Sequence, residues 1–150
     1  MASGTCTLSG ANVAAGFLNV WFTAAAMSPS FPTNWYIALD CGIPTTNGTQ
    51  YEVSSGNSYA RLSETRNTTQ FTTVTGANNT MNNGVTFAFA TSTGVWTGNS
   101  GANTQVQGAV IYDASTSGNP WWYGLLTTAQ TVVNNNILQF LANNFQIQLS

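Results

Sequence analysis

Hydrophobic residues occur in short runs along most of the chain, separated by segments rich in Gly, Pro, Asn and Ser. Residues 107–126 (QGAVIYDASTSGNPWWYGLL) hold two such runs on either side of a turn-forming segment that spans residues 113–120. Strands favour β-branched and aromatic residues, and turns favour Asp, Gly, Asn and Pro. The pattern predicts a β-hairpin whose second arm, with Trp121, Trp122 and Tyr123, supplies a large share of the core.

One segment near the start has the hydrophobic spacing of a helix. Apolar residues recur every three or four positions over residues 11–27 (ANVAAGFLNVWFTAAAM), in two adjacent sets. The first set is Val13, Phe17, Val20, Trp21 and Ala24, and the second is Ala14, Leu18, Phe22 and Ala25. We expect an amphipathic helix with a wide apolar face over these residues. Residues 1–10 are small and polar, which predicts a flexible N-terminal arm or an edge segment.

The remaining pattern predicts an all-β fold with this helix at its start. About eight to nine short strands follow at close intervals, and the last of them, residues 145–149, alternates strictly between apolar residues and glutamine. Such spacing is typical of an antiparallel β-sandwich of the jelly-roll kind. Residues 11–150 are expected to form a single domain.

The composition is unusual in its lack of charge. Charged residues make up 4% of the chain, with two Lys or Arg, four Asp or Glu and no His, whereas about a quarter is usual. A nearly neutral polar surface offers little repulsion between molecules and favours association. Arg61 and Arg66 alone cannot neutralise many phosphates, so the sequence argues against binding of nucleic acid or of an anionic membrane.

The same composition argues against catalysis and against a cofactor. Without His or Lys, a Ser or Cys nucleophile lacks its usual base. The four carboxylates lie in no motif, and Asp40 and Asp113 each stand where a strand enters a turn, which favours acceptance of backbone hydrogen bonds. Cys6 and Cys41 are far apart in the sequence, which leaves open two buried thiols or a disulfide and makes a metal site improbable.

Two features suggest contacts between subunits. Glu64 would form a local or intersubunit ion pair with Arg61 or Arg66, whereas a buried pair of Arg61 with Glu64 or with Asp113 would fix the register of an interface. Because neighbouring residues of a strand point to opposite faces, Trp121 and Trp122 cannot both face the core. The outer ring would be covered by the helix, by a neighbouring subunit or by a sugar. The expected interface residues are Phe17, Trp21, Arg61, Glu64, Trp121 and Trp122.

Several motifs then resemble a known family. They are Ser58-Tyr59-Ala60-Arg61, the run from Gly108 to Ala114 (GAVIYDA) and the run from Gly118 to Thr127 (GNPWWYGLLT). In this order, after an apolar helix, they resemble small virion proteins of tailed phages that are described as tail-fibre-like and include capsid cement proteins. The chain departs from the family in its last turns, where Asn134-Asn135-Asn136 and Ala142-Asn143-Asn144 replace Gly-Asp and Pro-Ala-Gly.

The resemblance implies a β-sandwich that assembles on a phage particle as a homotrimer. The leading hypothesis is a non-enzymatic cement or decoration protein that binds the major capsid protein on the outer surface of the head and stabilises the shell. The alternative is a tail-fibre or receptor-binding tip domain that recognises host-surface glycans through aromatic and amide side chains.

Overall fold

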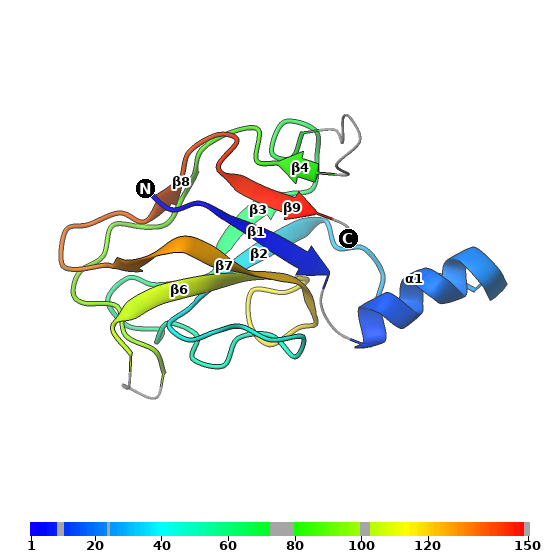
Figure 1. Ribbon diagram of the computed structural model, residues 1–150, viewed down its shortest axis with the longest axis horizontal. Helices are drawn as coiled ribbons and strands as arrows, with labels where there is room; N and C mark the ends of the chain where they lie inside the picture. The colour runs from blue at the N-terminus through cyan, green and yellow to red at the C-terminus, as the bar shows by residue number, and fades with distance from the viewer. Residues whose placement is uncertain (9–10, 24, 73–79, 100–102, 149–150) are drawn as a thin grey trace.

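The computed structural model describes residues 1–8, 11–23, 25–72, 80–99 and 103–148. Within them the fold is all-β with one helix, α1 (Ala11–Thr23), as the sequence predicts (Figure 1). The nine strands are β1 (Gly4–Leu8), β2 (Asn34–Asp40), β3 (Leu62–Thr65), β4 (Thr80–Asn82), β5 (Phe87–Ala88), β6 (Gln105–Tyr112), β7 (Pro120–Thr131), β8 (Gln139–Phe140) and β9 (Phe145–Gln148).

Seven strands form one curled, mixed sheet in the order β3-β2-β6-β7-β1-β9-β4. The β1–β9 pair is parallel and the other pairs in the sheet are antiparallel. In Figure 1, β2 and β3 lie behind β1 and β9, so the sheet curls back over itself. The described strands therefore do not divide clearly into the two facing sheets of a jelly roll, and the short β5–β8 pair stands apart from the large sheet.

Alternation along the strands places large apolar side chains inside the curl. In β2, Ile37 and Leu39 are fully buried in a core that also contains Phe145 of β9 and Phe140 of the separate β5–β8 pair. Ala38 points to the opposite face and packs in a smaller cluster with Val110 and Tyr112. Burying both faces of this strand explains why its sequence is apolar without interruption.

The predicted hairpin over residues 107–126 is confirmed. β6 and β7 pair antiparallel, with Val110 opposite Tyr123 and Ile111 opposite Trp122. Asp113 fixes the connecting loop, because its carboxylate accepts hydrogen bonds from the backbone N–H of Asn119 at 2.7 Å and from the indole N–H of Trp121 at 3.2 Å. This confirms the predicted role of Asp113 as a hydrogen-bond acceptor in a turn.

The prediction of a flexible arm over residues 1–10 is wrong. Gly4–Leu8 forms β1, a central strand that is paired with β7 on one side and with β9 on the other. A side chain at Gly4 would meet the carbonyl oxygen of Leu125 at 2.4 Å from its Cβ, so glycine allows this close approach of strands. The short, exposed side chain of Thr5 fits a strand whose outer face is solvated, which polarity alone did not reveal.

Two hydrophobic residues that are close in sequence should differ sharply in their contribution to the free energy of unfolding. Phe140 is fully buried, with its ring 4.9 Å from that of Phe145, whereas Ile137 is 52% exposed. Phe140→Ala should lower the free energy of unfolding by about 3–5 kcal/mol and Ile137→Ala by less than about 1 kcal/mol. Urea unfolding followed by tryptophan fluorescence measures both, and similar losses in the two variants would contradict this description of the core.

Candidate functional site

The helix α1 extends away from the sheet (Figure 1) and is held at its base by an aromatic cluster. The ring of Phe17 lies 6.3 Å from that of Trp121 and 6.0 Å from that of Phe31. Trp35 adds an edge-to-face contact to Trp121 with a centroid separation of 5.1 Å. At Gly16, a Cβ would come within 2.3 Å of the carbonyl oxygen of Ser28, so the absence of a side chain lets the following segment pass close to the helix.

Several of the described apolar side chains of the helix are exposed. The exposed fraction is 54% for Leu18 and 79% for Phe22, and Ala15 is exposed on the same stripe. The spacing of Ala15, Leu18 and Phe22 is three and then four residues, which is the spacing of a seam between packed helices. The structure has the helix end at Thr23 and not at residue 27 as predicted. The side chain of Trp21 lies outside the described residues.

Trp121 and Trp122 point to opposite faces of β7, as strand geometry requires. Trp121 is 1% exposed beneath Phe17 and Phe31, so the helix and its flanking segment cover it. Trp122 is partly buried against the main core. Trp121 is therefore the outer ring, and it is covered by the helix, which is one of the three predicted possibilities. Its ring offers no surface to a sugar.

Arg61 forms a clamp between two loops of the same chain. Its Nε and Nη2 atoms donate to the two carboxylate oxygens of Glu52, each at 2.8 Å, and its guanidinium lies 3.8 Å from the centre of the Tyr112 ring. Nη1 donates to the carbonyl oxygens of Ala114 and Ser117. Burial opposes the charge of Arg61, but the hydrogen bonds and charge of Glu52 outweigh burial and raise the pKa of the guanidinium. Within the described chain Arg61 therefore pairs with Glu52 and not with Glu64 or Asp113, while its place in an interface stays a prediction.

Glu64 lies on β3 opposite Trp35 of β2 and is 9% exposed. Desolvation raises the pKa of its carboxyl group, and a hydrogen bond from the Gln70 side chain opposes this shift in part. In the described part of the chain, the one ion pair is Arg61–Glu52, while Arg66 lies 5.3 Å from the centre of the Phe31 ring. Whether Glu64 contacts a neighbouring subunit stays a prediction.

The other acidic side chain with a fixed structural role is Asp40. It is fully buried and accepts hydrogen bonds from the backbone N–H groups of Gly42, Gln50 and Tyr51, at 2.8–2.9 Å, as predicted for a carboxylate at a strand end. The neighbouring Cys41 is a free, buried thiol, and burial followed by the charge of Asp40 raises its pKa to about 11. The side chain of Cys6 lies outside the described residues.

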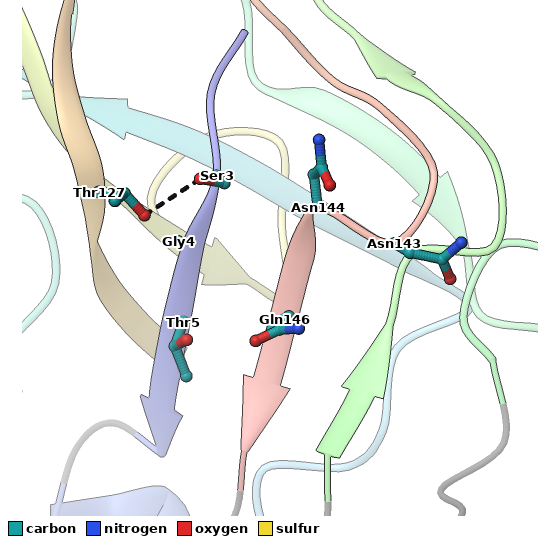
Figure 2. A pocket seen from close by; sticks show the side chains of 7 residues that line it. All are labelled: Ser3, Gly4, Thr5, Thr127, Asn143, Asn144 and Gln146. Carbon is teal, nitrogen blue, oxygen red and sulfur yellow. Dashed lines mark hydrogen bonds between the residues drawn. The ribbon is translucent and has the colours of Figure 1, made fainter.

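A polar hollow of about 220 Å³ opens on the outer face of the sheet, where β7, β1 and β9 lie side by side (Figure 2). Its lining consists of Ser3, Gly4, Thr5, Thr127, Asn143, Asn144 and Gln146. Figure 2 shows Thr5 and Gln146 on adjacent strands, where they are register partners. The Ser3 hydroxyl donates to that of Thr127 at 3.0 Å. No local sequence pattern indicates this site, because its residues come from three distant segments.

The described residues contain no group of three or more His, Cys, Asp or Glu side chains placed to hold a metal ion. No helix within the described ranges has both the length and the apolar character needed to cross a membrane.

Comparison with known proteins gives one finding about the family. A family model described as podophage GP4 fiber I protein gp80 matches residues 10–148. No curated protein matches the chain significantly. The family match confirms the resemblance to small virion proteins of tailed phages.

The Arg61 clamp yields a prediction about stability. Glu52→Gln leaves a largely buried guanidinium without its countercharge, which should lower the free energy of unfolding by about 2–4 kcal/mol. The double variant Arg61→Met/Glu52→Gln removes both charges and should lose less than the sum of the two single variants. Urea unfolding of all four proteins gives the coupling, and additive losses would show that the two side chains do not stabilise each other.

Glu64 yields a prediction about pH. Because its pKa in the folded protein is raised above the unfolded value of 4.5, folding is opposed at neutral pH, and this opposition fades as the pH falls through the raised pKa. Glu64→Gln should therefore increase the stability at pH 7 by about 1 kcal/mol or less, with no gain well below pH 4. Thermal unfolding of the wild-type protein and the variant across this pH range measures the difference in stability. A loss of stability at pH 7 would instead indicate a cation that holds Glu64 ionised.

Proposed function

The chain belongs to the podophage GP4 fiber I protein gp80 family and is a structural protein of a bacteriophage virion, and from this premise we propose that it is a non-enzymatic subunit of a virion fibre whose copies associate through α1. The observation that carries the proposal is the exposed apolar stripe of a helix that extends away from the sheet (Figure 1). A fibre subunit must present such a surface to its neighbours, and a lone molecule gains nothing from it.

A second copy of the chain is the partner that best fits this stripe. The helix carries no charged residue, so it has no charge to match on a different partner, and an identical helix meets it with an equally apolar surface. Phe31, 44% exposed beside the base of the helix, enlarges the apolar area. We take a homotrimer as the assembled state, because three projecting helices can pack around one axis with Leu18 and Phe22 inside.

The outer surface of the head is the alternative location. The same apolar helix would then contact the major capsid protein, and the protein would act as a cement protein. The description of the family as a fibre protein supports the fibre. The two proposals differ in location and in the partner of α1, and both use the same surface.

We propose no catalytic activity, because each of the four carboxylates already has a structural role or is buried. Asp40 and Asp113 hold turns, Glu52 holds Arg61, and Glu64 is buried against the sheet. Glycoside hydrolysis needs two carboxylates that flank a substrate, and these four are occupied or buried at separate places.

The assembly is tested by removing the apolar stripe. Burying each of these side chains contributes about 1.5–3 kcal/mol, so Leu18→Ser/Phe22→Ser should weaken association by roughly 100-fold or more. Sedimentation velocity measures the mass in solution. Val133→Ser/Ile137→Ser removes two exposed apolar residues far from α1 and serves as the matched control. A wild-type protein that stays monomeric at all concentrations, or a control that dissociates equally, would contradict the proposal.

A further inference from the structure

We propose that the polar hollow between β7, β1 and β9 binds a single neutral sugar unit. The site is distinct from α1, and its biological meaning as a receptor contact rests on the proposed fibre role. The proposal depends on three observations: the kind of groups that line the hollow, the lack of charge around it, and the rigidity of the backbone that presents it.

The lining groups match the hydrogen-bonding pattern of a sugar. Hydroxyls and amides can both donate and accept hydrogen bonds, as sugar hydroxyls do. Within the described part of the chain, no protein group is bonded to the side chains of Thr5, Asn144 or Gln146, so their donors and acceptors face the solvent. Three unpaired polar side chains that line one hollow provide several hydrogen bonds to one small ligand.

Charge excludes the other classes of small ligand. No Asp, Glu, Lys or Arg lines the hollow, so it offers neither a carboxylate ligand for a cation nor a countercharge for a phosphate or a carboxylate. Arg61 is engaged with Glu52, and Arg66 lies against Phe31. No aromatic or aliphatic side chain lines the hollow either, which argues against a lipid or a flat apolar compound. A neutral, hydroxylated molecule remains.

The hollow is open to solvent, and its volume holds about one sugar ring. A volume of about 220 Å³ corresponds to roughly seven water molecules at about 30 Å³ each. Pockets for drug-sized ligands are larger, at about 300–1,000 Å³. With no aromatic face for stacking, the affinity of one site should be in the millimolar range. Many copies on one virion would raise the total affinity through multivalency.

The backbone around the hollow is fixed by a buried asparagine. Asn83 is fully buried; its side-chain N–H groups donate to the carbonyl oxygens of Phe140 and Leu141, and its Oδ1 accepts from the N–H of Phe145. Its own carbonyl accepts a bond from the N–H of Asn143, which has a left-handed φ of 69°. The turn that carries Asn143 and Asn144 is therefore held in one conformation, and little ordering is needed when a ligand binds.

The test is a titration of the isotope-labelled protein by nuclear magnetic resonance. The probes are neutral hexoses, 6-deoxyhexoses and N-acetylhexosamines, each as the free sugar and as its methyl glycoside, which mimics a unit linked in a polysaccharide. Glucuronate is the charged probe. At least one neutral sugar should shift the amide resonances of Thr5, Asn144 and Gln146 in a saturable manner, and glucuronate should bind more weakly. Shifts with the methyl glycoside would point to a polysaccharide as the source, and shifts with the free sugar alone would point to a soluble one.

Two double variants make the result specific. Asn144→Ala/Gln146→Ala should weaken binding by about tenfold or more, since each lost hydrogen bond matters in so small a site. Gln50→Ala/Asn99→Ala removes the same residue types at exposed positions elsewhere and should leave binding unchanged. No saturable shift with any neutral sugar, shifts located away from the hollow, or equal binding of glucuronate would each overturn the proposal.

The outcome is separable from that of the fibre proposal. Asn144→Ala/Gln146→Ala should keep the mass of the assembly, and Leu18→Ser/Phe22→Ser should keep the sugar-induced shifts. A wild-type protein that assembles but shows no saturable sugar-induced shift would therefore reject the sugar site alone, and a wild-type protein that binds the sugar but stays monomeric would reject the role of α1 alone.

Discussion

Almost every charged side chain of this protein is used inside the fold, and the outer surface is left to neutral polar and apolar groups. Asp40 and Asp113 hold turns, Arg61 and Glu52 clamp two loops, and Glu64 is buried on β3. Arg66 is exposed, but its guanidinium lies against Phe31. The chain has six charged residues, two basic and four acidic, and five of them are engaged within the fold. Copies of the protein therefore repel one another very little.

This constraint connects the two proposed surfaces. Where the surface is apolar, as on α1, the absence of charge favours association of identical copies. Where it is polar, as on the outer face of β1 and β9, Ser, Thr, Asn and Gln offer hydrogen bonds without any charge. In the proposed fibre, the first surface holds the copies together and the second faces the medium, so assembly multiplies the weak contacts made by each hollow.

The hydrophobic pattern predicted most of the fold because local alternation and turn chemistry decide it. The hairpin of β6 and β7, the helix near the start and the final strand β9 all follow from short-range signals. The place of Gly4–Leu8 did not, since a strand of small polar residues is stabilised by partners on both sides that are distant in sequence. Likewise, the closure of the sheet into one curl depends on pairings that no local pattern contains.

The candidate sites were predictable to a smaller extent. The roles of Asp40 and Asp113 follow from their position at strand ends, and the opposed directions of Trp121 and Trp122 follow from strand geometry. The partner of Arg61 could not be chosen from the sequence, because Glu52 lies in an irregular segment whose path is set by packing. The polar hollow joins residues from both ends of the chain, so only the parallel pairing of β1 with β9 reveals it.

The measurement that tests the account most directly is a reconstruction of the whole virion by cryo-electron microscopy, at a resolution that shows helices. The account predicts this fold in a fibre of the phage, with the α1 helices of neighbouring copies in contact and the outer face of β1 and β9 towards the medium. Copies distributed over the head shell, or copies in a fibre whose α1 helices touch no neighbour, would contradict it.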